Sequence, residues 1–183
     1  ILFELGIDEE VVGVNDNDNY PEKVADKTRI GGIEYNIETI ISLQPDVVFA
    51  HESSMFTFES AIEQLEASGV TVFVVDNAET FDETYETIEV IGTLTGKDEE
   101  ADKIIASIQS KLADIQAKLQ GVSPKTAFMV VGASPDIYVV GQNTFMNEML
   151  KEINVDNAVK EEGWPLYSAE QFIAANPDSI VFT

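Results

Sequence analysis

Residues 98–120 read DEEADKIIASIQSKLADIQAKLQ, and the rest of the chain is arranged around this stretch. Its apolar residues recur at three- and four-residue spacing, the pattern of one buried stripe on a helix, at Ala101, Ile104, Ile105, Ile108, Leu112, Ile115 and Leu119. No Pro or Gly interrupts it; acidic residues open it and lysines lie toward its end, as the helix dipole favours. The stretch therefore predicts one long helix of about 35 Å.

Two similar segments flank this helix. The first begins YNIE at residues 35–38 and continues to PDVVF at 45–49; the second begins YSAE at 167–170 and continues to PDSIV at 177–181. Each residue of the second segment lies 132 positions after its counterpart. Asn36 and Ser168 are good helix N-cap residues, and Pro-Asp is a typical break before a strand. Each segment therefore predicts a short helix followed by a buried strand.

Strands and helices alternate in the predicted order, which is typical of an α/β fold with mainly parallel sheets. We predict two Rossmann-like lobes: residues 1–96 form the N-terminal lobe, 97–120 the connecting helix, and 121–183 a C-terminal lobe that looks incomplete. Thr80 and Glu83 fit a capping box for one of the helices. The segment at 137–140 is the one candidate for an antiparallel strand.

The composition of the chain excludes some classes of function. A hydrophobic content of 44% in 183 residues suits a globular core, and a net charge of −24 argues against nucleic acid or an anionic membrane as a partner. No apolar run is long enough to cross a membrane. Ile1, Leu2 and Leu5 resemble the end of a helix stopped by Gly6, so we expect any export signal to lie outside this sequence.

Few catalytic chemistries fit these residues. The chain has no phosphate-binding glycine motif and no nucleophile elbow, and His51 is its single histidine. With one histidine and no cysteine, a transition-metal site is not expected, nor is a resident cofactor. Three classes stay open at this point: a ligand-binding protein, an enzyme that uses Asp or Glu as acid–base residues on a Rossmann-like scaffold, and a surface adhesion module.

A binding cleft between the lobes is the site that the predicted elements favour, because open α/β sheets place ligands at the ends of their strands. The candidate contacts are loop residues near those ends: Tyr20, His51, Met55, Tyr138, Asn143 and Trp164. Aromatic rings supply apolar area with a polar tip, which suits a large ligand. Packing within a loop is the alternative role of each, and Trp164 is the strongest candidate because it joins no helical stripe.

The two repeats on either side of a long helix resemble the helical-backbone, class III, substrate-binding proteins of ABC importers, which carry cobalamin, ferric siderophores or haem. The cobalamin-binding members are the most similar, through Val12-Gly13-Val14, the 18–21 loop, Gly141, and Trp164-Pro165 before Ser168. His51 departs from that pattern, because an aromatic residue is expected there.

The resemblance implies several roles. Tyr20, Tyr138 and Trp164 match aromatic ligand contacts. Glu38 and Glu170 match a pair of acidic residues, one on each lobe, that dock on the permease dimer; the alternative is that both carboxylates serve only the helix dipole. The resemblance also implies a monomeric, exported protein without a catalytic step, periplasmic or lipid-anchored on the outer face of the cytoplasmic membrane.

Charge helps to choose the ligand. Triply anionic ferric catecholates favour a cluster of basic residues, but Arg29 is the only arginine and the lysines are scattered. We therefore expect cobalamin or another ferric siderophore, such as a hydroxamate. Haem is the alternative within the family, because His51 with Met55 could ligate its iron.

Overall fold

The computed structural model describes the backbone of all 183 residues and every side chain except those at positions 55–57. The chain divides into two compact units. Unit 1 contains residues 1–77 and 87–104, and unit 2 contains residues 78–86 and 105–183. Helices α3 (Phe81–Thr95) and α4 (Asp98–Lys118) each contribute residues to both units. The predicted boundaries after residues 96 and 120 remain a proposal.

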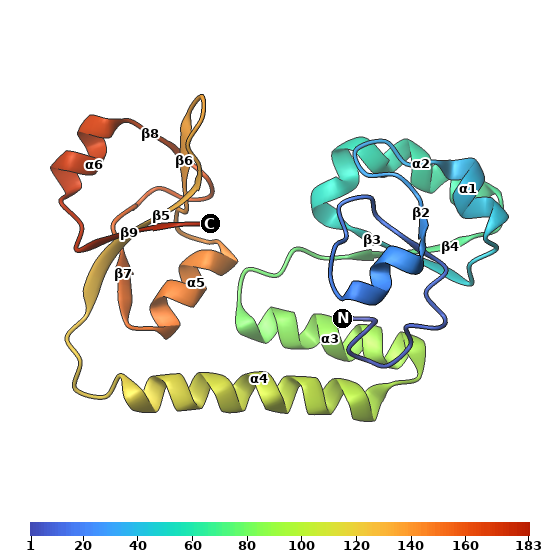
Figure 1. Cartoon of the computed structure of the whole chain (residues 1–183), viewed down its shortest axis with the longest axis horizontal. Coiled ribbons are helices and arrows are strands. Elements are labelled where there is room, and N and C mark those ends of the chain that lie inside the picture. The colour runs from blue at the N-terminus through green and yellow to red at the C-terminus, as the bar shows by residue number, and fades with distance from the viewer. The chain divides into compact units, whose positions relative to one another are not determined.

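Unit 1 holds two pairs of parallel strands. Strand β1 (Gly13–Val14) pairs with β2 (Thr28–Arg29), and β3 (Val47–His51) pairs with β4 (Thr71–Val75). Helices α1 (Ile37–Ser42) and α2 (Met55–Ala67) lie on one side of β3 and β4, as Figure 1 shows. The buried residues of this layer are Ile40, Ala50, Phe58, Ala61 and Leu65. This core holds the carboxyl end of β3 in place.

Unit 2 is built on one five-stranded sheet around β5 (Lys125–Gly132). Strands β7 (Val155–Asn157) and β9 (Ser179–Phe182) run parallel to β5, whereas β6 (Ile137–Val139) runs antiparallel to it and to β8 (Leu166–Tyr167). Helices α5 (Phe145–Glu152) and α6 (Ala169–Ala175) complete the unit (Figure 1). Phe128 is fully buried, with its ring centroid 4.3 Å from that of Phe172.

The two predicted repeats are confirmed in local detail. The Asn36 side chain accepts a hydrogen bond from Thr39 N and caps α1, and Ser168 caps α6 through Gln171 N. Each Pro-Asp pair is followed by its strand, β3 or β9. The prediction that both strands are buried is wrong for β9: all four of its residues are exposed, because among the described strands it pairs only with β5. In the second repeat, Asp178 accepts a bond from Thr126 N (2.8 Å), and this bond holds the pKa of Asp178 below its ordinary value. The carboxylate therefore joins β9 to the start of β5.

The α/β class with mainly parallel sheets is confirmed, and so is the capping box, in which Thr80 and Glu83 exchange bonds of 3.0 and 3.2 Å. The long helix ends at Lys118, two residues before the predicted end. Its stripe is buried only at Ala101 and Ile105, while Ile115 is 38% exposed, so the expectation of a continuous buried stripe is wrong. Ile1 to Gly6 form hydrogen-bonded turns, and Gly6 has a φ of 74°.

Three short strands were not predicted. One of them is β2, whose residues Thr28 and Arg29 pair with β1. The residues of β7 and β8 were left without structure, and β8 adds a second antiparallel pairing next to the one predicted for residues 137–140. Strands of two or three residues are too short to display an alternating pattern, so only their partners in the sheet define them.

Candidate functional site

The carboxyl end of β3 in unit 1 borders a cavity of about 470 Å³. Two predicted contacts, Tyr20 and His51, lie on its wall, together with Phe49 and Tyr35. The Tyr20 side chain is 79% exposed, so its ring is free of loop packing. None of the described residues that line this cavity is Lys or Arg. The cavity therefore offers aromatic area and a few polar atoms, and no positive cluster.

The loop that carries Tyr20 is held by side chains of unit 1. Asn15 N donates to Asp18 Oδ2 (2.8 Å), and Arg29 Nη1 donates to the carbonyl oxygens of Asn15 (2.7 Å) and Asp18 (2.8 Å). Asn15 Nδ2 also donates to the Tyr35 hydroxyl (3.2 Å). The only arginine of the chain thus orders a loop, and its guanidinium is engaged with backbone oxygens.

His51 ends strand β3 with its ring exposed. Its Nδ1 accepts a hydrogen bond from Ser53 N (3.2 Å) and lies 2.8 Å from Ser53 Oγ. An accepting Nδ1 favours the neutral tautomer with its proton on Nε2. Met55, the residue predicted to act beside His51, lies outside the described side chains.

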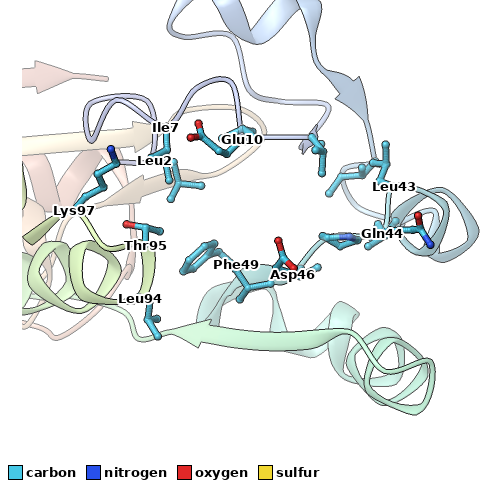
Figure 2. Close-up of a pocket in the computed structure, with 18 residues that line it drawn as sticks. Leu2, Ile7, Glu10, Leu43, Gln44, Asp46, Phe49, Leu94, Thr95 and Lys97 are labelled. Atoms are coloured by element: carbon cyan, nitrogen blue, oxygen red, sulfur yellow. The ribbon is translucent and has the colours of Figure 1, made fainter.

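A second cavity in unit 1, of about 420 Å³, lies at the other end of β3, where Asp46 and Val47 begin the strand. Figure 2 shows Leu2, Ile7, Phe49 and Leu94 among the apolar residues around it, with the acidic Glu10 and the basic Lys97. None of the predicted contacts whose side chains are described lines this cavity. Because α/β sheets bind ligands at the carboxyl ends of strands, the cavity beside Tyr20 is the better candidate.

In unit 2 the structure brings two loops together. Gly141 N donates to Gly163 O (2.7 Å), Gln142 N donates to Glu161 O (2.7 Å), and Gly163 N donates back to Gln142 O (2.9 Å). These bonds place the loop that contains Asn143 beside the loop that contains Trp164. Tyr138 lies on the adjoining strand β6, opposite Leu166. The three predicted contacts of unit 2 therefore belong to one surface region.

These contacts are available to a ligand. Trp164 is 50% exposed and Tyr138 is 43% exposed, so neither ring is packed inside unit 2. Asn143 is also exposed and has a φ of 56°, in the left-handed region that Asn tolerates better than most residues. With half of its surface exposed, Trp164 is not part of the core of unit 2.

Several polar residues that shape these loops were not predicted. Asn15, Asp18 and Tyr35 order the loop of unit 1, and Gln142, Glu161 and Tyr167 order those of unit 2. The loop at residues 18–21 was singled out from the sequence, but the hydrogen-bond partners of this loop were not predicted. The partners are separated in sequence by up to 20 residues in unit 1, so no local pattern reveals them.

A hydrogen bond of 2.7 Å joins the Tyr167 hydroxyl to Glu161 Oε2 at the base of the Trp164 loop. Burial of the phenol, followed by the bond to Glu161, raises the pKa of Tyr167 to about 12. The same bond holds the pKa of Glu161 below its ordinary value. Both shifts stabilise the pair as phenol and carboxylate.

We expect one of the five tyrosines to titrate at about pH 12 in the folded protein, and this step should be missing from Tyr167→Phe. An unfolded tyrosine has a pKa near 10, so the stability contributed by this phenol is complete below about pH 10. It is lost as the pH rises toward 12. Absorbance at 295 nm during alkaline titration measures the step. Identical titrations of the two proteins would contradict the assignment.

The two carboxylates predicted to dock on a permease are exposed. Glu38 and Glu170 lie in the first turns of α1 and α6, immediately after the cap residues Asn36 and Ser168. Neither takes part in an ion pair among the described residues. Each carboxylate interacts favourably with the positive end of its helix dipole, and each is exposed so that a partner could contact it.

Two structural features are absent from the described part of the chain, namely a group of metal-ligating side chains and a membrane-spanning helix. No three His, Asp or Glu side chains there are grouped as metal ligands would be. No helix of the described residues has the length and apolar character required to cross a bilayer.

Comparison with known proteins identifies a family and several relatives that this chain resembles. A family model described as periplasmic binding protein matches residues 1–183. The ABC transporter substrate-binding lipoprotein YvrC of Bacillus subtilis, itself uncharacterised, is 43% identical over 187 residues, covering 100% of this chain and 60% of the relative. The vitamin B12-binding protein of Photorhabdus laumondii is 24% identical over 186 residues, covering 100% of this chain and 66% of that protein.

Among solved structures, a possible iron-binding, periplasmic solute-binding protein from Staphylococcus epidermidis superposes with a TM-score of 0.89 at 33% identity. The match covers 100% of this chain and 72% of that one. The chain therefore spans about two thirds of the length of its relatives. With the whole chain matched by the family model, it belongs to the periplasmic binding protein family, as the two repeats around its long helix indicated.

Proposed function

We propose that this chain is the substrate-binding component of an ABC importer and that it captures a metal chelate, either cobalamin or a ferric siderophore. The proposal draws on relatives whose names describe an ABC transporter lipoprotein and a vitamin B12-binding protein, and on a structural neighbour described as possibly iron-binding. It involves no catalytic step. Tyr20 and His51 form a ligand subsite on unit 1, and Tyr138, Asn143 and Trp164 form a contact surface on unit 2.

The observation that carries this proposal is the exposure of three large rings on ordered backbone. Tyr20, Tyr138 and Trp164 are 79%, 43% and 50% exposed, although their neighbours are hydrogen-bonded in place. Rings that are exposed on ordered backbone present apolar area that a large, flat ligand can cover, and little further ordering is needed when it binds. A small-molecule enzyme substrate does not require such an area.

The charge of the residues around Tyr20 limits which class of chelate fits this subsite. A ferric catecholate carries three negative charges and calls for several basic partners. The Arg29 guanidinium is hydrogen-bonded to carbonyl oxygens of the Tyr20 loop, and none of the described residues that line the Tyr20 cavity is Lys or Arg. Cobalamin, or a hydroxamate chelate of low charge, therefore fits this subsite better.

The same proposal places the protein outside the cytoplasm, periplasmic or anchored as a lipoprotein, where it acts as a monomer. Glu38 and Glu170 then serve as the carboxylates that meet basic residues of the permease. Their exposure in the first turns of α1 and α6 leaves both available for that contact.

Ligand titration tests the proposal. We expect cobalamin, ferrichrome or haem to quench the fluorescence of Trp164 in a saturable way, and Trp164→Phe to lose that signal. Haem as the only ligand would select the alternative within the family. Absence of binding to all three chelates, with turnover of a small substrate, would show that the proposed function is wrong.

A further inference from the structure

The buried polar side chains of unit 2 gather at one place. Thr144, Asn147 and Asn157 are 6%, 2% and 5% exposed, and they are the buried polar residues of the described chain. Thr144 ends the loop at residues 140–144, which follows β6; Asn157 bonds to Val140 O at the start of this loop, and Asn147 bonds to both Thr144 and Asn157. Buried polar groups are costly unless they are hydrogen-bonded, and no buried polar side-chain atom among the described residues lacks a partner. The cluster therefore has a specific bonding pattern.

Asn157 is the centre of this pattern. Its Nδ2 donates to Val140 O (2.9 Å) and to Asn147 Oδ1 (3.1 Å), while its Oδ1 accepts from Val159 N (3.0 Å). One amide thus binds the backbone before Asn143 and the backbone that leads toward Trp164. A hydrophobic side chain of similar size would fill the same space without making these bonds.

The loop at 140–144 is closed by a second residue of the cluster. Thr144 Oγ1 donates to Gly141 O (3.0 Å) and accepts from Asn147 N (3.2 Å), which also caps α5. These two bonds turn the chain sharply between β6 and α5. Asn143 is left exposed at the outside of the turn with its φ of 56°.

The two loops are in backbone contact. Gln142 Nε2 donates to Val159 O (2.7 Å), in addition to the three bonds between the loop backbones described above. A Cβ on Gly141 would lie 2.4 Å from Glu161 O, so this approach requires glycine. Any change in the position of residues 157–163 is therefore transmitted to residues 140–143.

We propose that Asn157 is a positioning residue that holds the Asn143 loop and the Trp164 loop in one arrangement before the ligand arrives. This inference rests on the proposed function for its consequence in binding. Asn157 itself is buried and does not touch the ligand. Its amide fixes two loops that would otherwise lose conformational entropy on binding, and such preorganisation raises affinity.

The test compares Asn157→Leu with Val130→Ala. Val130 is 3% exposed in the same unit and packs with Val139 and Val159 in the apolar core. Its truncation therefore lowers stability next to the two loops without removing any of the hydrogen bonds of the cluster. Trp164 is the single tryptophan of the 183-residue chain and reports loop motion directly. Time-resolved anisotropy of the free protein measures this motion, and calorimetric titration with cobalamin, ferrichrome and haem measures affinity.

We expect Asn157→Leu to increase the amplitude of nanosecond motion of Trp164 and to weaken chelate binding about fivefold, because each newly mobile side chain must be ordered on binding. Val130→Ala should match the wild type in both measurements, even where its melting temperature falls equally. Gln142→Leu removes one partly buried hydrogen bond between the loops, so we expect smaller changes in Trp164 motion and in chelate affinity, both in the same direction. If Asn157→Leu does not fold, the same two measurements on Gln142→Leu test the proposal.

The two proposals can fail separately. If the wild type binds none of the three chelates, the proposed function is wrong, while the anisotropy still decides whether Asn157 orders the loops. If Trp164 moves no more in Asn157→Leu and Gln142→Leu than in Val130→Ala, Asn157 is not a positioning residue. Equal affinity of the variants and the wild type for a chelate that does bind would also overturn the inference.

Discussion

Uptake of the chelate should fall to background in cells whose protein carries both Glu38→Lys and Glu170→Lys. Both carboxylates are exposed in first turns of short helices, outside the two regions proposed to meet the ligand. Each exposed ion pair with the permease contributes only about 0–1 kcal/mol, but complementary charge sets the orientation and rate of association. Two reversals convert attraction into repulsion, so the loss should exceed that expected from two deleted contacts.

Binding of the chelate to the purified double variant should stay within about twofold of the wild type, since long-range effects of exposed charges are screened beyond about 10 Å. The matched control is Glu63→Lys with Asp114→Lys, which makes the same change in net charge at two exposed positions on α2 and α4. Because lysine disfavours a helix N-terminus, thermal stability is compared in parallel, with Glu38→Gln and Glu170→Gln as the milder pair. Normal uptake by the double variant would show that Glu38 and Glu170 do not dock on the permease and serve only to stabilise the N-termini of their helices.

The second large effect concerns Trp164. Replacing it with Ala should weaken chelate binding about five- to tenfold, because a ring against a flat ligand contributes on the order of 1 kcal/mol beyond its buried area. The side chain is 50% exposed in unit 2, so its removal opens no internal cavity and should leave the melting temperature nearly unchanged. Isothermal titration calorimetry measures the change, since the variant has lost its fluorescent reporter.

Trp164→Phe is the matched variant, and we expect it to recover most of the lost affinity by keeping an aromatic face. Substitution of Ile173, which is 79% exposed on α6 of the same unit, provides the surface control as Ile173→Ala. If Trp164→Ala binds the chelate as tightly as Ile173→Ala does, the indole is not a ligand contact.

Much of the local structure could be predicted from the sequence because its causes are local. The caps Asn36 and Ser168 bond to residues three positions ahead, and each helix ends shortly before the proline of its Pro-Asp pair. The repeat was therefore visible as residues at constant spacing, and it led to the family. The aromatic candidates Tyr20, Tyr138 and Trp164 were selected because they lie near the ends of predicted strands, and all three are exposed.

Tertiary structure alone decided how these residues are held. Asn157 gives no sequence signal, since its partners Val140 and Asn147 lie 17 and 10 residues away, one after β6 and the other in α5. The sequence shows that Arg29 is the only arginine, but only the structure shows that its guanidinium is bound to the carbonyl oxygens of residues 15 and 18. The stripe of α4 is continuous in sequence, but burial requires packed neighbours, and at Ile115 these are too few to cover the side chain. Sequence specifies what each residue can bond to nearby, while the choice among distant partners is made by the fold.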